Sequence, residues 1–444
     1  MHVMLMTYGT RGDVQPFVAL GRGLIENGHQ VTLAAPERFA GFVTGHDLEF
    51  AALGDALIAL MDDPHFGRAS DPKASRLQKL ISLFAIGRKA RRLQDGLIDD
   101  IFRAIDQNSP DVIVFHPKTF GAFPIANHFG IPVIMAQLIP CFIPTGDYPH
   151  MGVPDTGLRN RFARCYNHLT GKLVYRLLNA TLRRQFCRWA ARRKNGIDGR
   201  SLDIVKSCQS GALRIIHAFG NAVIPRPSDW PENAHVTGYW FLDTDTDPQT
   251  GMPDRALQDF VERHKNLIYI GFGSMHGNDP TAMAQMISNA VAQTGKPDLA
   301  AIVATGWGGM DGIDWPSNIL AVREVPHDWL FPKVKIVLHH GGAGTCAAAL
   351  RAGRPSIIIP FFGDQPFWAK RLWTLGVAPK PIKPAKLDAA ILADRIKTVL
   401  QTPSYRANAQ QIAGRIAAED GINTAIAEII RAVEETDHTR TASL

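Results

Sequence analysis

The chain has 444 residues, of which 45% are hydrophobic, and a formal net charge of +7. One hydrophobic core rarely supports so long a chain, so we expect two globular domains of roughly 200 residues each. The five cysteines are odd in number and form no CxxC pair, which argues against a disulfide framework or a zinc site.

The positive charge is concentrated in two segments. Residues 158–195 contain eleven Lys or Arg and no Asp or Glu, and residues 68–92 contain eight basic residues and one acidic residue, Asp71. The remainder of the chain is net negative. An evenly basic chain would suggest nucleic acid, whereas two basic segments suggest a patch that faces an anionic membrane surface or an acidic partner. No stretch reaches the roughly 18 apolar residues of a membrane span, so we expect a cytoplasmic protein, with peripheral membrane contact through this patch and no nucleic-acid partner.

Residues 1–220 predict a Rossmann-like domain in which strands and helices alternate. A buried strand is predicted at 3–8, a glycine-bearing turn at 9–13, and a helix from about 16 to 27. A second strand at 31–35 completes a strand–helix–strand unit with the crossover length of a parallel sheet. Later strands of the same sheet are predicted at 111–115, 131–137 and 213–218.

Both basic segments have apolar residues at helical spacing, as at Leu169, Leu173 and Leu177. One interpretation is a helix packed on the sheet with a solvated basic face. The other is a surface helix that lies against a membrane or shapes a channel for a lipid acceptor. The sequence favours neither.

Residues 221–255 are rich in Pro, Asp and Thr, and we interpret them as an interdomain linker. Their DxD pattern, Asp243 to Asp247, fits an acidic linker better than a calcium loop, because Pro248 stands where that loop needs Gly. A second alternating α/β domain is predicted over 256–403. Helices over 404–435 are expected to cross back to the first domain.

A cluster of glycines lies where a predicted strand ends and a helix begins, in His339-His340-Gly341-Gly342-Ala343-Gly344-Thr345. Backbone N–H groups at such a helix N-terminus can meet a diphosphate at close range. A tight turn with two structural histidines is the alternative. Because ligands bind at the carboxyl ends of parallel strands, we predict a diphosphate site.

The next strand is followed by Asp364 and Gln365 at the same edge of the sheet. Their hydrogen-bonding groups suit adjacent sugar hydroxyls. The alternative is that Asp364 caps the following helix, and one residue can serve both roles.

These two motifs resemble the donor-binding signature of the two-Rossmann (GT-B) UDP-glycosyltransferase superfamily, and within it most resemble sterol 3-beta-glucosyltransferases. The likeness spans nearly the whole chain, and its motifs occur in the same order. It rests on residues 9–17, 227–230, 237–241, 325–331, 339–349 and 360–368. The resemblance implies two facing Rossmann-like domains, with the acceptor in the first and the nucleotide sugar in the second.

The resemblance also implies roles for single residues. The diphosphate would contact His340, Gly342, Gly344 and Thr345, with Ser274 in the other phosphate loop. Asp364 and Gln365 would hold the sugar. Val325 and His327 would border the base, and Trp307 would line the cleft. Plant relatives place a Glu eight residues after the motif histidine to hold the ribose, and here that position is Ala348. The choice between UDP and dTDP therefore stays open.

Asp13 is the candidate catalytic base, because an inverting transfer needs a group that takes the proton of the acceptor hydroxyl. It lies in the loop of Gly9, Thr10, Arg11 and Gly12, which we place beside the acceptor. Alternatively, Asp13 caps the helix before Pro16, and a helix N-terminus would lower its pKa. His116, at the end of a predicted strand, would assist Asp13 or have a structural role.

We therefore expect an inverting, metal-independent hexosyltransferase, with a UDP-sugar as co-substrate and no other cofactor. By resemblance it moves glucose to a hydroxyl of a sterol or a similar lipid. One alternative is a dTDP- or UDP-sugar transferase that acts on a polyketide or carotenoid aglycone. Others are a non-catalytic membrane adaptor that binds nucleotide sugars and a UDP-sugar epimerase.

Overall fold

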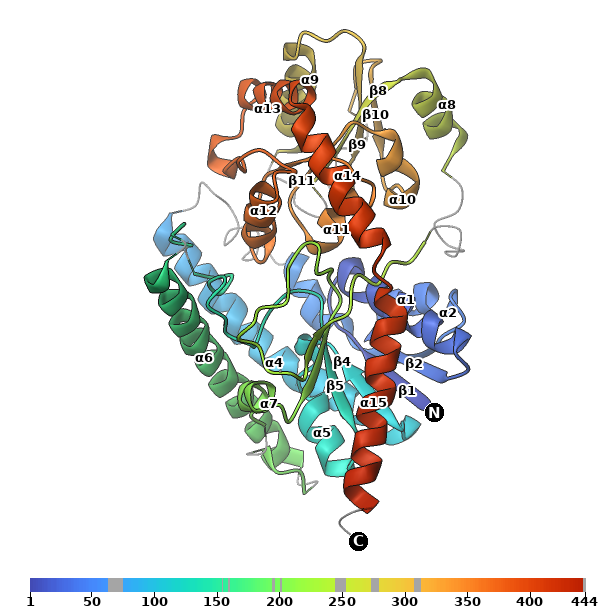
Figure 1. The fold of residues 1–444 in the computed structure, drawn as a ribbon, viewed down its shortest axis with the longest axis vertical. Coiled ribbons are helices and arrows are strands. Elements are labelled where there is room, and N and C mark those ends of the chain that lie inside the picture. The colour runs from blue at the N-terminus through green and yellow to red at the C-terminus, as the bar shows by residue number, and fades with distance from the viewer. Residues whose placement is uncertain are drawn as a thin grey trace. The chain divides into compact units, whose positions relative to one another are not determined.

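The computed structural model describes residues 1–62, 75–153, 155–158, 160–193, 196–199, 202–243, 253–272, 279–306 and 313–441. The chain forms two compact units (Figure 1). Unit 1 takes its described residues from 1–242 and from 419–441, and unit 2 takes its residues from 243–418.

Unit 1 is built on a seven-stranded sheet in the order β3-β2-β1-β4-β5-β6-β7, and every neighbouring pair of strands is parallel. The strands are β1 (His2–Met6), β2 (Gln30–Pro36), β3 (Glu49–Leu53), β4 (Val112–Phe115), β5 (Val133–Gln137), β6 (Arg214–His217) and β7 (Ala234–Val236). The central strands β1 and β4 are apolar runs that are almost fully buried, as is typical of parallel strands covered on both faces.

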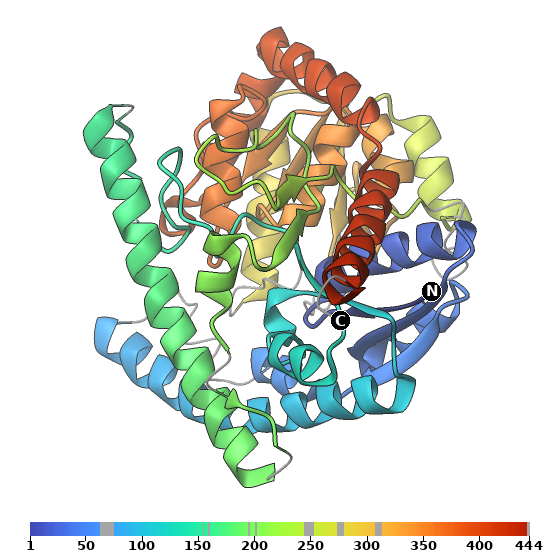
Figure 2. The same ribbon diagram turned by 60° about the horizontal axis from the view of Figure 1, so that its bottom comes forward.

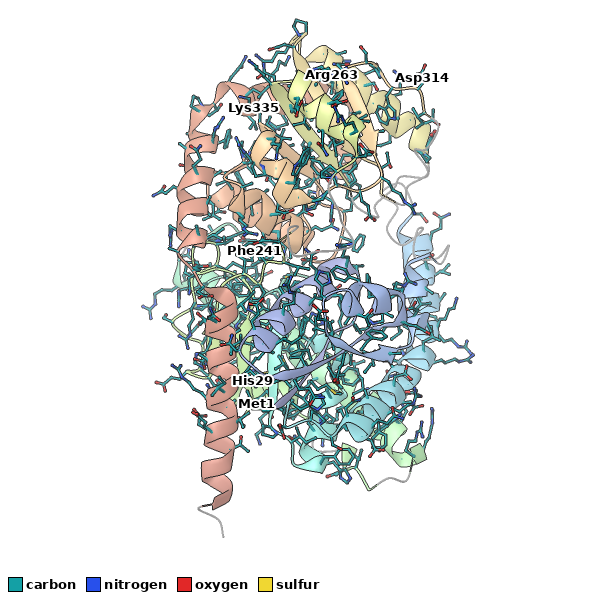
Figure 3. The ribbon with its side chains drawn as sticks, turned by 90° about the vertical axis from the view of Figure 1, so that its right-hand side faces the viewer. Met1, His29, Phe241, Arg263, Asp314 and Lys335 are labelled. Atoms are coloured by element: carbon teal, nitrogen blue, oxygen red, sulfur yellow. The ribbon has the colours of Figure 1, made fainter. Side chains whose placement is uncertain are left out.

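The helices of unit 1 are α1 (Arg11–Glu26), α2 (Ala40–Thr44), α4 (Arg76–Asn108), α5 (Ala122–Phe129), α6 (Arg161–Arg193), α7 (Ile204–Ser210) and α15 (Gly421–Thr441). Short 3-10 helices lie at Glu37–Phe39, Asp55–Asp62 and Pro117–Thr119. Met1 and His29 mark the amino-terminal edge of the sheet (Figure 3), where the N–H of Gln30 bonds the carbonyl of Met1 at 3.1 Å. The loops described below as the candidate site leave the opposite edge.

Unit 2 has a five-stranded parallel sheet in the order β10-β9-β8-β11-β12. Its strands are β8 (Asn266–Gly271), β9 (Leu299–Ala304), β10 (Ile319–Val322), β11 (Ile336–His339) and β12 (Ser356–Ile358). Its helices are α8 (Arg255–Arg263), α9 (Pro280–Gln293), α10 (His327–Leu330), α11 (Ala343–Arg351), α12 (Gln365–Thr374), α13 (Ala389–Gln401) and α14 (Pro403–Ala417), with 3-10 turns at Phe331–Lys333 and Pro384–Lys386. The predicted fold class, two Rossmann-like α/β domains, is confirmed.

The order of the strands fixes where each sheet can bind a ligand. In unit 1 the chain proceeds outward from β1 to β3 and then restarts at β4 on the other side of β1. In unit 2 it proceeds from β8 to β10 and restarts at β11. A crevice forms at the carboxyl edge where the order reverses, because the two adjacent loops leave in opposite directions. The loops after β1 and β4, and those after β8 and β11, therefore define the candidate sites.

Helix α1 begins at Arg11, so the expected start near residue 16 is wrong. Thr10 is the N-cap residue, and its backbone N–H donates to the Asp13 carboxylate at 2.8 Å. This capping box starts the helix within the predicted turn and leaves Pro16 inside the helix. Asp13 is therefore the third helical residue, and it does not cap a helix that starts at Pro16.

The predicted linker over 221–255 is too long, because the residues up to 242 belong to unit 1. β7 lies in this segment and pairs with β6, and Trp230 and Trp240 are buried. These apolar residues anchor the segment despite its many prolines. The helices expected to cross back divide: α14 belongs to unit 2, whereas α15 packs on α1 in unit 1, where Gly23 lies against Ile422.

Candidate active site

In unit 1 the loops after β1 and β4 bring Asp13 and Lys118 together. The Lys118 ammonium donates to Oδ1 of Asp13 at 2.6 Å, while the backbone N–H of Thr10 donates to Oδ2 at 2.8 Å. The side chain of Asp13 is 16% exposed and that of Lys118 is 51% exposed. The candidate base is thus a carboxylate held at the switch point of the sheet by a cation that solvent can reach.

Gly9 makes room for this ion pair. Its φ of +141° lies in a region that L side chains rarely adopt. A Cβ atom at this position would collide with the Asp13 carboxylate and would lie 2.8 Å from Nζ of Lys118. The first predicted loop residue therefore has a steric role in placing the carboxylate.

His116 lies beside the pair, at the N-cap of the short 3-10 helix that carries Lys118. Its Nδ1 accepts from the backbone N–H of Lys118 at 3.2 Å, so a neutral ring carries its proton on Nε2, 3.9 Å from Oδ1 of Asp13. Burial and, to a smaller extent, the Lys118 charge lower the pKa of His116 to about 3, although the Asp13 charge acts to raise it. His116 is therefore neutral at pH 7.

The pKa of Asp13 lies below its ordinary value. Burial of the carboxyl acts to raise this pKa, but the charges of Lys118 and His116 and the hydrogen bonds from Lys118 and Thr10 outweigh it. Because His116 is neutral at pH 7, Lys118 supplies the charge that matters there. Asp13 is consequently ionised but weakly basic as long as Lys118 stays paired with it.

The remaining residues of this loop are placed by local contacts. The guanidinium of Arg11 lies over the ring of Phe42, 4.4 Å from its centre, and its Nε donates to Gln15 at 3.3 Å. Gly12 is exposed on the first turn of α1. The predicted acceptor loop is thus one continuous stretch at the carboxyl edge of β1.

In unit 2 the two motif histidines differ in role. His339 is fully buried, and its Nδ1 accepts from the N–H of Gly341 at 3.1 Å. Gly341 has a φ of +93°, and a Cβ there would lie 2.8 Å from Ile358. His339 and Gly341 therefore shape the turn from β11 to α11, which is the structural role that sequence reasoning had allowed for these histidines.

His340 is half-buried and lies over the start of α11. A Cβ added at Gly342, the N-cap residue, would come within 2.6 Å of Nε2 of His340. Burial lowers the pKa of His340 to about 4, and a hydrogen bond to the backbone carbonyl of Gly271 acts in the opposite direction. The ring is therefore neutral at pH 7 in the free protein.

The N-terminus of α11 is open to a ligand. Gly342 provides no side-chain cap, and the first N–H groups of a helix have no partner within the helix. Gly344 is exposed, and a Cβ there would meet nothing within 4 Å. Thr345 is half-buried in the same turn. This turn presents backbone N–H groups, the positive end of the helix and an imidazole to one place, which suits a diphosphate.

Asp364 and Gln365 lie at the start of α12, after the neighbouring strand β12. Oε1 of the buried Gln365 accepts from the N–H groups of Phe361 and Phe362 at 2.7 and 3.2 Å. Oδ2 of Asp364 accepts from the indole N–H of Trp368 at 2.9 Å, and the side chain makes no capping bond to the helix backbone. Asp364 is therefore the N-cap residue by position, but its side chain bonds Trp368 and does not cap the helix.

The predicted base-binding stretch forms the loop from β10 to α10. Val325 is half-buried, and His327 stacks on Phe331 with ring centres 4.3 Å apart. Ser274 and Trp307 lie outside the described residues. Asp243 of the DxD pattern forms an ion pair with Arg351 of α11, and residues 244–247 lie outside the described part of the chain.

Lys118 is the residue that sequence reasoning missed. It stands two residues after His116, but its contact with Asp13 depends on β1 and β4 being neighbours in the sheet. The one signal in the sequence was that two buried strands of the same predicted domain each ended in a polar loop.

Two family models match the chain. Residues 3–104 match the glycosyltransferase family 28 N-terminal domain, and residues 288–435 match the C-terminal domain of erythromycin biosynthesis protein CIII-like proteins. The chain is 33% identical to a sterol 3-beta-glucosyltransferase of Saccharomyces cerevisiae over 97% of its length, and 31% identical to one of Cryptococcus neoformans over 98%. It spans 35% and 27% of these two proteins.

Solved structures share the fold. The glycotransferase of kitacinnamycin superposes with a TM-score of 0.69 at 19% identity, and the match covers 97% of this chain and 98% of the other. The glycosyltransferase VinC, solved in complex with dTDP, gives 0.65 at 18% identity over 98% of this chain and all of the other. Both comparisons show that the chain, with its two parallel-sheet units, has the GT-B glycosyltransferase fold.

Proposed function

We propose that the chain is a member of the GT-B fold UDP-glycosyltransferase superfamily and that it is an inverting hexosyltransferase, which moves a sugar from a UDP-sugar to a hydroxyl group of a sterol or a similar lipid. The observation that carries this proposal is the turn from β11 to α11. There, Nε2 of His340 lies over Gly342 at an uncapped helix N-terminus, one strand away from Asp364 and Gln365. An anion site beside groups that bond hydroxyls suits a nucleotide sugar.

In this proposal Asp13 takes the proton of the acceptor hydroxyl. The acceptor oxygen then forms a bond to the anomeric carbon, while the bond from that carbon to the UDP oxygen breaks and UDP leaves with the electron pair. The N–H groups of α11 and the ring of His340 stabilise the charge on the leaving diphosphate. Ser274 and Trp307 keep the roles that the family resemblance implies, a phosphate contact and the lining of the cleft.

The proposal includes no metal ion and no cofactor besides the nucleotide sugar. Its support is that the helix N-terminus and His340 can themselves take the charge of the leaving group. Full transfer activity in the presence of a chelator is the expected result, and activity that returns only with added divalent metal would contradict this part.

The acceptor class rests on the names of the two fungal relatives, of which this chain spans about a third. A second candidate, transfer of a dTDP- or UDP-sugar to a polyketide or carotenoid aglycone, is favoured by the erythromycin-type model over residues 288–435. Ala348 stands where plant relatives carry a ribose-binding Glu, so this position does not select between UDP and dTDP.

We also propose that the protein works in the cytoplasm, peripherally at a membrane, where a hydrophobic acceptor is found. Among the described residues, no helix is long and apolar enough to cross a membrane. The basic segments 68–92 and 158–195 are the parts of the chain that support contact with an anionic surface.

The proposal is tested by incubating the protein with UDP-glucose and a mixed lipid extract, followed by mass spectrometry of the lipids. The expected product is a glycosylated sterol whose mass exceeds that of the sterol by one hexose residue. A parallel reaction with dTDP-glucose and polyketide aglycones tests the second candidate. Hexosylated product there and none with any sterol would overturn the sterol assignment, and UDP-sugar conversion without acceptor would indicate an epimerase.

A further inference from the structure

One long helix of unit 1, α6, has an outer face that is exposed. Helix α6 lies along the outer side of unit 1, beside α4 and away from α15 (Figures 1 and 2). Its inner face is buried through Ala163, Gly171, Tyr175, Phe186 and Trp189. The buried inner face holds the helix in place, so apolar residues on the outer face are not needed for that purpose.

The outer face carries a stripe of large apolar side chains, which we call the apolar stripe. It consists of Phe162, Leu169, Leu173 and Leu177, which are 83%, 59%, 60% and 62% exposed. Residues at spacings of seven, four and four fall on one side of a helix, and the stripe runs for about 22 Å. A solvated face would not need four such residues in a row, and contiguous exposed apolar surface marks a contact site.

Basic side chains beside the stripe remain available to a partner. Arg176, Arg183, Arg184 and Arg188 are exposed and make no ion pair with any residue in the part of the chain that the structure describes. We call these four the arginine group. Long arginine side chains can reach past apolar surface to charged groups in water.

Three other arginines of α6 provide an internal contrast. Arg164 bonds Asp147 at 2.6 Å, Arg192 bonds Asp95 at 2.5 Å, and Arg193 bonds Asp99 at 2.8 Å. These three arginines are thus neutralised, two of them by α4, whereas the arginine group has no ion-pair partner among the residues that the structure describes. Since residues 158–195 contain no carboxylate, α6 itself offers the group no partner.

Helix α4 has the same combination over its first turns. Ile81 and Phe84 are 57% and 72% exposed, and with Arg88 and Arg92 they line an open hollow. Farther along the two helices, the ion pairs of Asp95 with Arg192 and of Asp99 with Arg193 hold α6 to α4. The apolar and basic character therefore continues from α6 onto its neighbour.

From this arrangement we propose that α6 docks on an anionic lipid bilayer, with the apolar stripe in the interface between headgroups and acyl chains and the arginine group on the lipid phosphates and carboxylates. A bilayer fits better than a protein because apolar side chains beside a row of unpaired cations, with no anion on the helix, match a surface that is apolar below and anionic above. The proposal deepens the membrane location within the proposed function, but its test measures binding alone.

The test uses the full chain and vesicles without sterol or UDP-sugar. Co-sedimentation is measured with phosphatidylcholine vesicles, with and without phosphatidylserine, at low and physiological salt. The expected result is binding that requires phosphatidylserine and weakens with salt, because exposed charges are screened. Wild-type protein that binds no phosphatidylserine vesicles would overturn the proposal, whether or not the protein transfers sugar.

Two variants separate the components of the surface. Leu169→Ser/Leu173→Ser/Leu177→Ser removes most of the apolar stripe, and Arg176→Gln/Arg183→Gln/Arg184→Gln/Arg188→Gln removes the arginine group. Each is expected to lower the vesicle affinity at least about tenfold. The matched control Lys380→Gln/Lys383→Gln/Lys386→Gln/Arg415→Gln changes the net charge by the same amount on exposed residues of unit 2, and we expect it to bind like the wild type.

The outcomes are decisive because these side chains are exposed, and circular dichroism checks that each variant is folded. Equal loss in the control and the arginine variant would show that net charge alone drives binding and would overturn the assignment to α6. A wild-type dimer that the leucine variant dissociates, with vesicle binding unchanged, would make the stripe a protein interface and overturn the proposal as well.

Discussion

The carboxyl edges of the two sheets share the same reversal of strand order but carry different functional groups. In unit 1 the loops after β1 and β4 hold a carboxylate, Asp13, against a cation, Lys118. In unit 2 the loop after β11 holds a neutral imidazole, His340, over a helix N-terminus, and the ring bonds the backbone of Gly271 at the end of β8. The fold fixes where ligands can bind, and the loops decide which charge they meet.

The difference also concerns how each site is kept ready. Asp13 is restrained by an ion pair with a half-exposed lysine. The loop after β11 is set by glycines and by the buried bond from the N–H of Gly341 to His339. We therefore expect changes in unit 1 to act on catalysis and its pH dependence, and changes in unit 2 to act on nucleotide affinity.

The largest effect is expected from Asp13→Asn. This change keeps the shape of the side chain but removes the proton acceptor, so kcat should fall roughly 10²- to 10⁴-fold. The Kd for UDP, measured by calorimetry, should stay within about twofold of the wild type, since the residue lies in unit 1. A full loss of UDP binding in this variant would contradict the proposal that the base lies in unit 1 and the nucleotide site in unit 2.

The next effect is expected from His340→Ala. Loss of a hydrogen bond to a charged diphosphate should raise the Kd for UDP roughly 10- to 100-fold. His128→Ala removes an exposed histidine of unit 1 and serves as the control. Unchanged UDP affinity in His340→Ala would mean that the ring does not contact the diphosphate.

A smaller effect is expected from Gly9→Ala, judged against Gly28→Ala. Both glycines have positive φ, but a Cβ at residue 9 meets the Asp13 carboxylate, whereas one at residue 28 meets nothing within 4 Å. Backbone strain should cost each variant about 1–3 kcal/mol in the free energy of unfolding, measured in urea. Only Gly9→Ala should also lower kcat. Equal kcat in the two variants would show that Gly9 does not position the base.

The most modest effect is expected from Lys118→Met. Without the ammonium, burial raises the pKa of Asp13, and a base must be deprotonated to work. The pH below which kcat/KM declines should therefore move upward, with a smaller change at the plateau. Lys206→Met, an exposed lysine of α7, is the control. If the pH below which kcat/KM declines does not move in Lys118→Met, then Lys118 does not control the basicity of Asp13.

Much of this comparison could be predicted from the sequence. The runs that became β1 and β11 are continuous and apolar, and each is followed by glycines, so strand, loop and helix were predicted in the right order. Element ends were less accessible. Helix α1 starts at Arg11 because Thr10 and Asp13 form a reciprocal cap, and β7 escaped notice because it is three residues long and contains a histidine.

The rest depended on the fold in space. Asp13 and Lys118 are 105 residues apart and meet only because β4 pairs with β1. The different roles of His339 and His340 follow from the turn at Gly341, which directs one ring inward and leaves the other over Gly342. Exposure of Leu169, Leu173 and Leu177 was equally undecided in the sequence, where helical spacing fits a buried face as well as an outer one.

The decisive measurement is the rate of UDP release from UDP-glucose, with and without a sterol, in wild-type protein and in Asp13→Asn. We predict that release requires the sterol, that it is lost in the variant, and that the variant still binds UDP with wild-type affinity. Release that proceeds equally fast without acceptor, or that survives in Asp13→Asn, would contradict the assignment of a base in unit 1 and a nucleotide-sugar site in unit 2.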